Sequence, residues 1–351
     1  MYKRDLELIK KGKEEMKKDR SAQDEKIILS VIIPVYNAEK FIKACLESIV
    51  VQNKDNMEII LVNDGSTDSS LKICEEIKEN IDNIVLVNQD NLGVSAARNT
   101  ALKRAKGKLV YFCDSDDLVA PKAIDFIIDM WIKHKYELLC FQYIRFNEKR
   151  PVIEQVNIKD DCCKISREKA LVQIHEDVDV SGFLWNKCFN MEVIRKNNIL
   201  FDEDIKILED EIFALKYISY CKEIFISKNI LYFYRRDMSS TLLQKNKEKK
   251  LQAAKGRIGI YETIISNEML DNNVIRKNAW NYMMDAIIAA YGDTLLSKLK
   301  NKKVWKKYLE SKFCCYYFDY KHMFKLNKRE ILYRILQMCT LKNRKKEGKN
   351  V

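Results

Sequence analysis

The sequence predicts an α/β protein built on a doubly wound, mostly parallel sheet. Between residues 27 and 120, short apolar runs alternate with segments of helical periodicity, which is the order of consecutive βαβ units. Each apolar run ends in polar residues, and these are expected at one edge of the sheet. The last run, Leu109–Cys113, stops at three carboxylates, Asp114, Asp116 and Asp117.

The elements of this first half follow in order. Four apolar runs predict buried strands at residues 28–35, 58–62, 84–87 and 109–113. Between them we expect three helices: one carrying Phe41 to Ile49 at helical spacing, one starting at Ser66–Asp68, and one over Ser95–Ala105. Asn37 is in position to cap the first helix. Right-handed crossovers then bring the four strand-to-helix turns to one cleft.

The second half is less regular. A helix is expected from Pro121 to about His134, followed by a strand at 138–144 and polar loops to about Asp179. Three clusters of polar and aromatic residues come next, at 183–187, 208–211 and 234–241. The pattern is helical from about residue 246 to 297 and continues into a tail at 298–351.

Length and composition exclude several classes. At 351 residues the chain exceeds one ordinary core. Its 47% hydrophobic and 32% charged residues fit a soluble globular protein. No run approaches the ~20 apolar residues of a membrane span, and the N-terminus lacks the apolar region of a secretory signal. Eleven cysteines without a C-x-x-C pair favour reduced thiols in a cytosolic protein.

The positive charge is concentrated in the tail. The formal net charge is +12, and residues 298–351 contain 17 Lys and Arg against four Asp and Glu. Three interpretations of this tail are open. It packs as helices with a solvated Lys face, it binds nucleic acid, or it docks on an anionic membrane, where each basic residue contributes about 1 kcal/mol.

Several nucleotide-binding motifs are missing. No G-x-G-x-x-G opens the first helix, which disfavours a dinucleotide fold, and no G-x-x-x-x-G-K-[ST] indicates a P-loop. With three His residues in the chain, a His-based zinc site is not expected.

The Asp114–Asp117 run has two interpretations. An Asp-x-Asp pair repels itself unless a cation lies between the carboxylates, and a divalent metal carrying phosphates is the obvious candidate. The alternative is a solvated acidic turn that caps the next helix. Taken in isolation, the run fits that alternative slightly better.

Seven motifs together favour a metal site over an acidic helix cap. They are SVIIPVYN (30–37), LVNDGSTD (61–68), NLGVSAARN (91–99), YFCDSDD (111–117), WNK (185–187), EDEIF (209–213) and YRRDMSST (234–241). In this order and spacing the chain resembles the inverting family 2 glycosyltransferases of bacterial surface-glycan type, which have the GT-A fold. The resemblance covers residues 27–245 and implies that they form a GT-A catalytic domain. Before it, the charge pattern of residues 1–26 predicts an exposed extension. After it, residues 246–351 are expected to form a helical, basic and aromatic region. Within the catalytic domain, residues 27–120 would bind the nucleotide-sugar and 121–245 the acceptor.

The resemblance assigns eight residues to the nucleotide-sugar: Pro34, Tyr36, Asn37, Asp64, Arg98, Asp114, Ser115 and Asp116. The first three would wall the base pocket. Asp64 would accept a base N–H, usually of uridine in this family. Asp114 would contact the ribose, and Asp116 would hold Mg²⁺ or Mn²⁺ against the diphosphate. Arg98 matches a family position without a defined role.

A second set would serve the acceptor and the diphosphate: Trp185, Asn186, Lys187, Glu209, Asp210, Arg235, Arg236 and Thr241. Asp210 would be the general base that deprotonates the acceptor hydroxyl, and Trp185 an apolar platform for the acceptor sugar. The last three would close a loop over the cleft. Simpler explanations exist: Trp185 is as readily a core residue, the acidic run a solvated helix start, and the two arginines a solvated surface pair.

The resemblance thus implies transfer of a hexose or N-acetylhexosamine from a UDP-sugar to a growing, lipid-linked surface glycan. It favours membrane docking of the tail over nucleic-acid binding, and a cytoplasmic enzyme that is peripheral on the inner face of the cell membrane. Two alternatives remain, a sugar nucleotidyltransferase and a non-catalytic nucleotide-sugar-binding protein. The acidic run and the 234–241 motif argue against the first, and the complete set of acidic site residues argues against the second.

Overall fold

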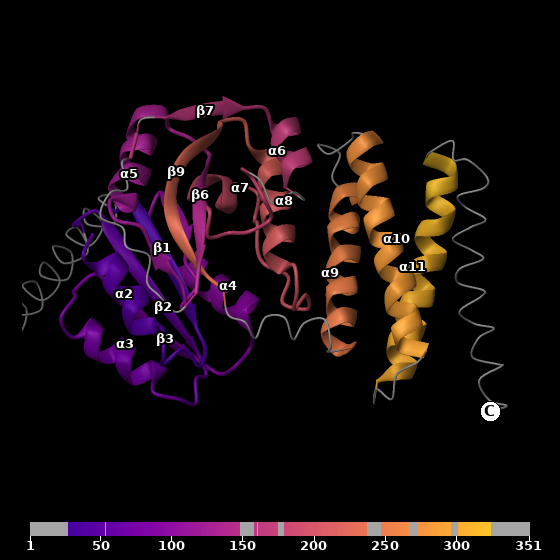
Figure 1. Ribbon diagram of the computed structural model, residues 1–351, viewed down its shortest axis with the longest axis horizontal. Coiled ribbons are helices and arrows are strands. Elements are labelled where there is room, and N and C mark those ends of the chain that lie inside the picture. Colours follow the sequence, from indigo (N-terminus) through magenta and orange to yellow (C-terminus); the bar gives the residue numbers. More distant parts are fainter. Residues whose placement is uncertain are drawn as a thin grey trace, which may run out of the picture. The chain divides into compact units, whose positions relative to one another are not determined.

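The computed structural model describes residues 27–52, 54–147, 158–159, 161–174, 179–236, 247–266, 273–295 and 301–323. The chain divides into two compact units (Figure 1). One consists of residues 1–201 and 220–236 and contains the sheet. The other consists of residues 202–219 and 237–351, and its described regular elements are helices. Residues 202–219 therefore group with the C-terminal helices and not with the sheet.

The first half of the sheet is parallel, as the sequence predicts. Its strands are β1 (Leu29–Val35), β2 (Met57–Asp64), β3 (Ile84–Gln89) and β4 (Leu109–Phe112), in the order β3-β2-β1-β4. The helices α2 (Ile42–Val50), α3 (Ser70–Lys78) and α4 (Val94–Arg104) follow the first three strands. The predicted α/β class and the parallel sheet of the first half are confirmed by this strand order. Polar residues follow β1, β2 and β4 at one edge of the sheet.

The second half adds strands of both directions. β8 (Lys187–Asn190) lies antiparallel between β4 and β6 (Leu138–Phe146), and β9 (Ile224–Arg235) runs parallel to β6. β9 also pairs antiparallel with β5 (Leu118–Val119) and β7 (Cys162–Ile165). The helices here are α5 (Ala123–His134), α6 (Arg167–Gln173) and α7 (Met191–Lys196).

One local prediction was wrong. The stretch read as polar loops up to Asp179 contains β7 and α6. Among the described residues, β7 pairs only with β9. Two of its four side chains are exposed, so its sequence lacks the apolar run of a buried strand.

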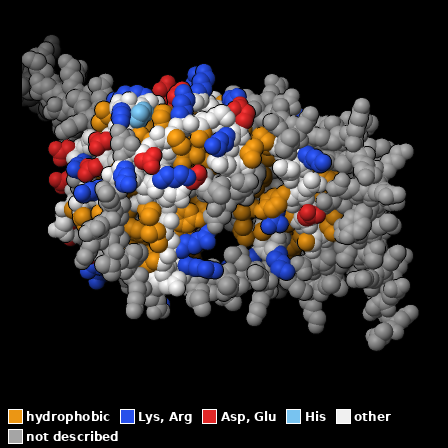
Figure 2. Space-filling view, turned by 45° about the horizontal axis from the view of Figure 1, so that its top comes forward, with side chains coloured by type: hydrophobic (Ala, Val, Ile, Leu, Met, Phe, Trp, Pro, Cys, Tyr) orange, Lys and Arg blue, Asp and Glu red, His pale blue; other side chains and the backbone are white. Residues whose placement is uncertain are grey.

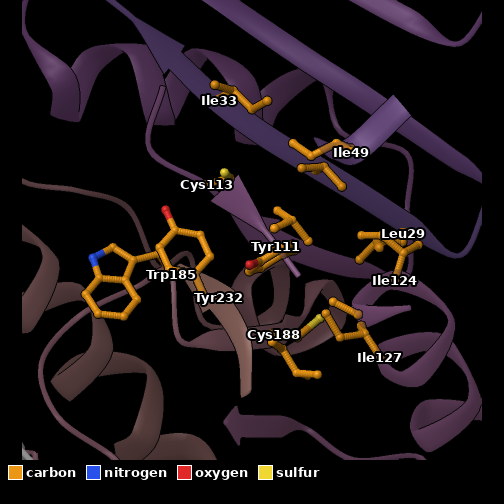
Figure 3. Close-up of a cluster of buried hydrophobic side chains, with 14 of the residues drawn as sticks. Leu29, Ile33, Ile49, Tyr111, Cys113, Ile124, Ile127, Trp185, Cys188 and Tyr232 are labelled. Carbon is orange, nitrogen blue, oxygen red and sulfur yellow. The ribbon is translucent and has the colours of Figure 1, made fainter. Parts of the chain in front are cut away.

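Both faces of the parallel half are covered. Side chains of β1 alternate between the faces, and Leu29 and Ile33 share a buried cluster with α2, α5 and Tyr111 of β4 (Figure 3). On the other face, Phe112 packs edge-on against Phe189 and Phe201, with ring centroids 5.7 and 5.6 Å apart. The described cysteines are free thiols.

The helical unit contains α8 (Glu209–Tyr220, assigned to this unit through Ser219), α9 (Lys247–Ser266), α10 (Asn273–Leu295) and α11 (Lys302–Met323). α10 packs against both α9 and α11. Among the described residues, no helix combines the length and apolar composition needed to cross a bilayer. On the face shown in Figure 2, Lys and Arg side chains are interspersed with Asp and Glu. The extension at 1–26 and the tail from residue 324 lie outside the described residues.

Candidate active site

A cavity of about 370 Å³ lies at the carboxyl edge of the parallel strands. Its walls come from the turns that follow β1, β2 and β4 and from the start of α4, which is where an open α/β sheet binds ligands. Seven residues predicted to bind the nucleotide-sugar line it: Pro34, Tyr36, Asn37, Asp64, Asp114, Ser115 and Asp116. The structure thus brings together residues that are up to 82 positions apart in the sequence.

The turn after β1 is tied to the turn after β2. Asn37 adopts a left-handed φ of 48°, a conformation that Asn tolerates better than most residues. Its Oδ1 accepts a 2.8 Å hydrogen bond from Thr67 N–H, and its own N–H donates to Ser66 Oγ. Asn37 therefore does not cap the next helix as predicted; α2 begins at Ile42 without a side-chain cap. Tyr36, 50% exposed, is left at the cavity wall.

Asp64 shapes the turn that follows β3. Its Oδ1 accepts hydrogen bonds from Gln89 Nε2 at 2.8 Å and Leu92 N at 2.9 Å, and its Oδ2 accepts one from Gly93 N at 2.8 Å. The residue is 3% exposed. The next residue, Gly65, has φ 69°, and a Cβ there would meet Asn91 N at 2.7 Å. The contact of Asp64 with a base remains a prediction.

Arg98 lies behind the cavity, not in its lining. It is 6% exposed, its Nη2 is 3.3 Å from Asp114 Oδ1, and its guanidinium lies 5.4 Å from the Phe201 ring centroid. Opposite charges at this distance attract each other, so the ion pair ties Asp114 to α4. Arg98 therefore supports Asp114 from within the fold.

Asp117 is the acidic residue to which the sequence assigned no contact, and it is fully buried. Its Oδ2 accepts a 2.7 Å hydrogen bond from Tyr232 Oη, and its Oδ1 accepts one of 2.6 Å from Arg235 N. Burial, and then the charges of Asp114 and Asp116, raise the pKa of Asp117 to about 9, although these two hydrogen bonds lower it. The hydrogen bonds of Asp117 depend on where β9 lies, so the sequence alone did not indicate them.

Asp116 lines the cavity and is the residue predicted to hold a metal. Within the described residues, no group of three or more His, Cys, Asp or Glu forms a ligand set for a metal ion. Two carboxylates in a cavity are still compatible with Mg²⁺, which is commonly bound by one or two carboxylates plus substrate phosphates and water. The donor set fits a metal that arrives with a diphosphate.

The segment that forms the cavity is also the segment that resembles known proteins. Residues 30–190 match the model of glycosyl transferase family 2, and they include the strands and turns that form the cavity. Over these residues the chain is similar to the glycosyl transferases of family 2.

Relatives and solved structures extend the match. The chain is 31% identical to the uncharacterized glycosyltransferase EpsJ of Bacillus subtilis over 215 residues, 61% of this chain and 62% of EpsJ. It is also 31% identical to the poly(ribitol-phosphate) beta-glucosyltransferase of Bacillus spizizenii, over 59% of this chain and 32% of that protein. The match thus spans less than two thirds of either relative. The crystal structure of Staphylococcus aureus TarS 1–349 with UDP-GlcNAc superimposes with a TM-score of 0.57 at 20% identity, covering 82% of this chain and 88% of that one.

The residues predicted to serve the acceptor are more buried than the sequence suggested. Trp185 is 5% exposed, and its ring stacks on Phe183, Tyr232 and Tyr234, with centroids 4.6–5.0 Å apart (Figure 3 shows it beside Tyr232). A ring so enclosed offers no platform to a sugar in this structure, which agrees with the core interpretation. Asn186 and Lys187 are 1% and 0% exposed, so all three residues of the WNK motif belong to the interior.

Lys187 is held by oxygen atoms. Its Nζ donates to the Phe183 carbonyl at 2.6 Å and to Asn186 Oδ1 at 2.7 Å. A buried ammonium group needs such partners to offset its lost hydration. In this structure Lys187 therefore stabilises the chain around residues 183–187.

The remaining candidates lie in different places. Glu209, Asp210 and Glu211 form the first turn of α8, in the helical unit, and Asp210 Oδ1 accepts a hydrogen bond from Glu211 N–H at 2.8 Å. Arg236 is exposed, and its backbone N–H donates to Phe146 O. Thr241 lies outside the described residues.

Proposed function

We propose that the chain is an inverting, metal-dependent glycosyltransferase. It would move a hexose or N-acetylhexosamine from a UDP-sugar to a hydroxyl of a growing, lipid-linked glycan. The observation that carries this proposal is that Asp64, Asp114 and Asp116 line one cavity at the carboxyl ends of parallel strands. TarS, with a similar fold, was crystallised with UDP-GlcNAc, and a relative acts on poly(ribitol-phosphate) by its name.

Different residues would serve the base, the ribose, the metal and the proton transfer. The β1 and β2 turns would enclose the base, and Asp114, held by Arg98, would bind the ribose. Asp116 would hold the divalent cation, which when bound offsets the charge on the diphosphate leaving group. Asp210 would take the proton of the attacking hydroxyl, because an inverting displacement needs one carboxylate base on the acceptor side.

UDP release tests this function. Full-length protein is incubated with a panel of UDP-sugars, Mn²⁺ or Mg²⁺, and poly(ribitol-phosphate) or lipid-linked glycan acceptors. We expect Asp116→Asn and Asp210→Asn each to reduce turnover at least about 100-fold, since general-base catalysis alone contributes 10²–10⁴-fold. Asp129→Asn, which changes an exposed carboxylate on α5, is the control. Full turnover in Asp116→Asn or Asp210→Asn would refute these roles.

The same assay separates the alternatives. A sugar nucleotidyltransferase would release pyrophosphate from UTP and a sugar phosphate, and a non-catalytic protein would bind UDP-sugar without releasing UDP.

We also propose that the basic tail docks the enzyme on the inner face of the cell membrane. The support is the charge excess in residues 298–351 and its attraction to anionic lipids. Sedimentation with anionic liposomes, with and without residues 298–351, tests it. Equal binding by both proteins, or binding by neither, would contradict the proposal.

A further inference from the structure

The turn that carries Asp114 and Asp116 is short and self-repelling. It joins β4, ending at Phe112, to β5, starting at Leu118. Asp114 and Asp116 are two like charges two positions apart, and they repel one another. Inside the turn, one backbone hydrogen bond of 3.2 Å runs from Asp117 N–H to Asp114 O. Contacts from outside are therefore needed to fix its shape.

Those contacts come from the end of β9. Tyr232 Oη accepts a 3.1 Å hydrogen bond from Asp114 N–H and donates a 2.7 Å bond to Asp117 Oδ2, because a hydroxyl serves as acceptor and donor at once. Arg235 N–H donates to Asp117 Oδ1, and Arg235 Nε donates to Asp116 O at 2.7 Å. Three of the four turn residues are thus held by two residues of one strand.

Strand pairing sets this arrangement. β5 and β9 are antiparallel, with Leu118 opposite Phe233 and Val119 opposite Tyr232. Extending this register by two residues places Asp116 opposite Arg235. The same register that builds the sheet therefore aligns the end of β9 with the acidic turn.

The Arg235 side chain is itself restrained. Its guanidinium carbon lies 4.9 Å from the Phe41 ring centroid and 4.5 Å from that of Phe146, within the range of cation–π attraction. Phe41 also lines the cavity. A planar guanidinium suits such rings and a directed Nε–H bond, whereas the ammonium of Lys is a point charge.

We propose that Tyr232 and Arg235 are positioning residues that hold the Asp114–Asp117 turn in its metal-binding shape. Arg235 then acts through the Asp116 backbone, and not as the ligand of the diphosphate that its motif implied. This inference rests on the proposed use of Asp116 as a metal ligand.

Calorimetry with uridine and UDP, each in EDTA and in Mn²⁺, tests the inference on the full-length protein. For Tyr232→Phe and Arg235→Lys we expect unchanged affinity for uridine, and for UDP in EDTA. The tightening of UDP binding by Mn²⁺ should fall about tenfold, as expected when one buried hydrogen bond is lost. Tyr220→Phe and Arg104→Lys, at exposed positions, are matched controls that should keep the full Mn²⁺ effect.

The other outcomes have definite meanings. If Arg235→Lys weakens UDP but not uridine in EDTA, Arg235 is a diphosphate ligand and the inference is wrong. An intact Mn²⁺ effect in Tyr232→Phe also overturns it, and so does loss of uridine binding in both variants, because the defect would not be confined to the metal. If the wild-type protein shows no tightening by Mn²⁺, it is the proposed metal dependence that fails.

Discussion

Two glycines of α9, Gly256 and Gly259, lie close to residues in and just before α8. Replacing each by Ala gives two variants that can be compared directly. A Cβ added at Gly256 would lie 2.2 Å from the carbonyl oxygen of Ile207, a separation that real Cβ atoms essentially never show. At Gly259 the nearest atom would be Ile212 Cδ1 at 2.9 Å, the end of a flexible side chain. A backbone carbonyl cannot rotate away as a terminal methyl group does. Gly256→Ala should therefore force α9 away from this segment, and Gly259→Ala should not.

The magnitudes follow from two opposing effects. Replacing Gly by Ala inside a helix gains about 1 kcal/mol of helix propensity, and overpacking a well-packed site costs about 1–3 kcal/mol. At Gly256 the clash is with a backbone atom, so the upper end of this cost, about 3 kcal/mol, applies and we expect a net loss of about 2 kcal/mol in the free energy of unfolding. At Gly259 we expect a change between zero and a gain of about 1 kcal/mol.

Urea unfolding followed by circular dichroism measures both variants against the wild-type protein. The loss in Gly256→Ala should appear in the transition of the helical unit, which contains both glycines. Equal stability of the two variants, or a Gly256→Ala protein more stable than wild type, would refute the packing argument.

Three further predictions concern two sets of hydrogen bonds and the metal. Asn99→Ala removes the reciprocal hydrogen bonds to Phe201 O and Phe201 N at 3.0 and 2.9 Å, so urea unfolding should show a loss of about 2–4 kcal/mol; a loss below about 1 kcal/mol would contradict this. Burial raises the pKa of Asp68, but hydrogen bonds from Ser70 and Glu39 outweigh it and lower the pKa overall. The stability advantage over Asp68→Asn should therefore be complete above about pH 4 and shrink as the pH falls further, and a difference independent of pH would speak against it. EDTA should abolish UDP release and Mn²⁺ should restore it, whereas turnover that persists in EDTA would exclude the metal requirement.

The parallel half of the fold was predictable because each strand contains a nearly continuous apolar run. β1, β2 and β4 are buried on both faces or nearly so, and such strands can be recognised without alternation. β7 cannot, since half of its side chains are exposed. Helix starts were displaced for another reason: Asn37 and Asp68 bond across to each other's turns, a tertiary interaction that local capping rules cannot foresee.

The candidate site was predictable where a residue acts by its own type and place along the chain. Asp64, Asp114 and Asp116 end strands, so the fold alone brings them to one edge. Asp117 and Trp185 depend on partners far along the chain. Asp117 binds Tyr232, 115 positions away, and the Trp185 ring stacks on two tyrosines of β9 that no local pattern connects to it.

The two proposed halves of the chemistry belong to different units of the chain. The cavity is lined by residues of the first unit alone, whereas Asp210 belongs to the second, together with Gly256. Nucleotide binding should therefore depend on the first unit, and proton removal on the second. If this division holds, Gly256→Ala lowers the rate of UDP release and leaves uridine affinity intact, the reverse of what a defect in the Asp64 turn would do. Measuring both quantities on one variant thus asks whether the C-terminal helices contribute to turnover by supporting the segment that carries Asp210, the proposed base.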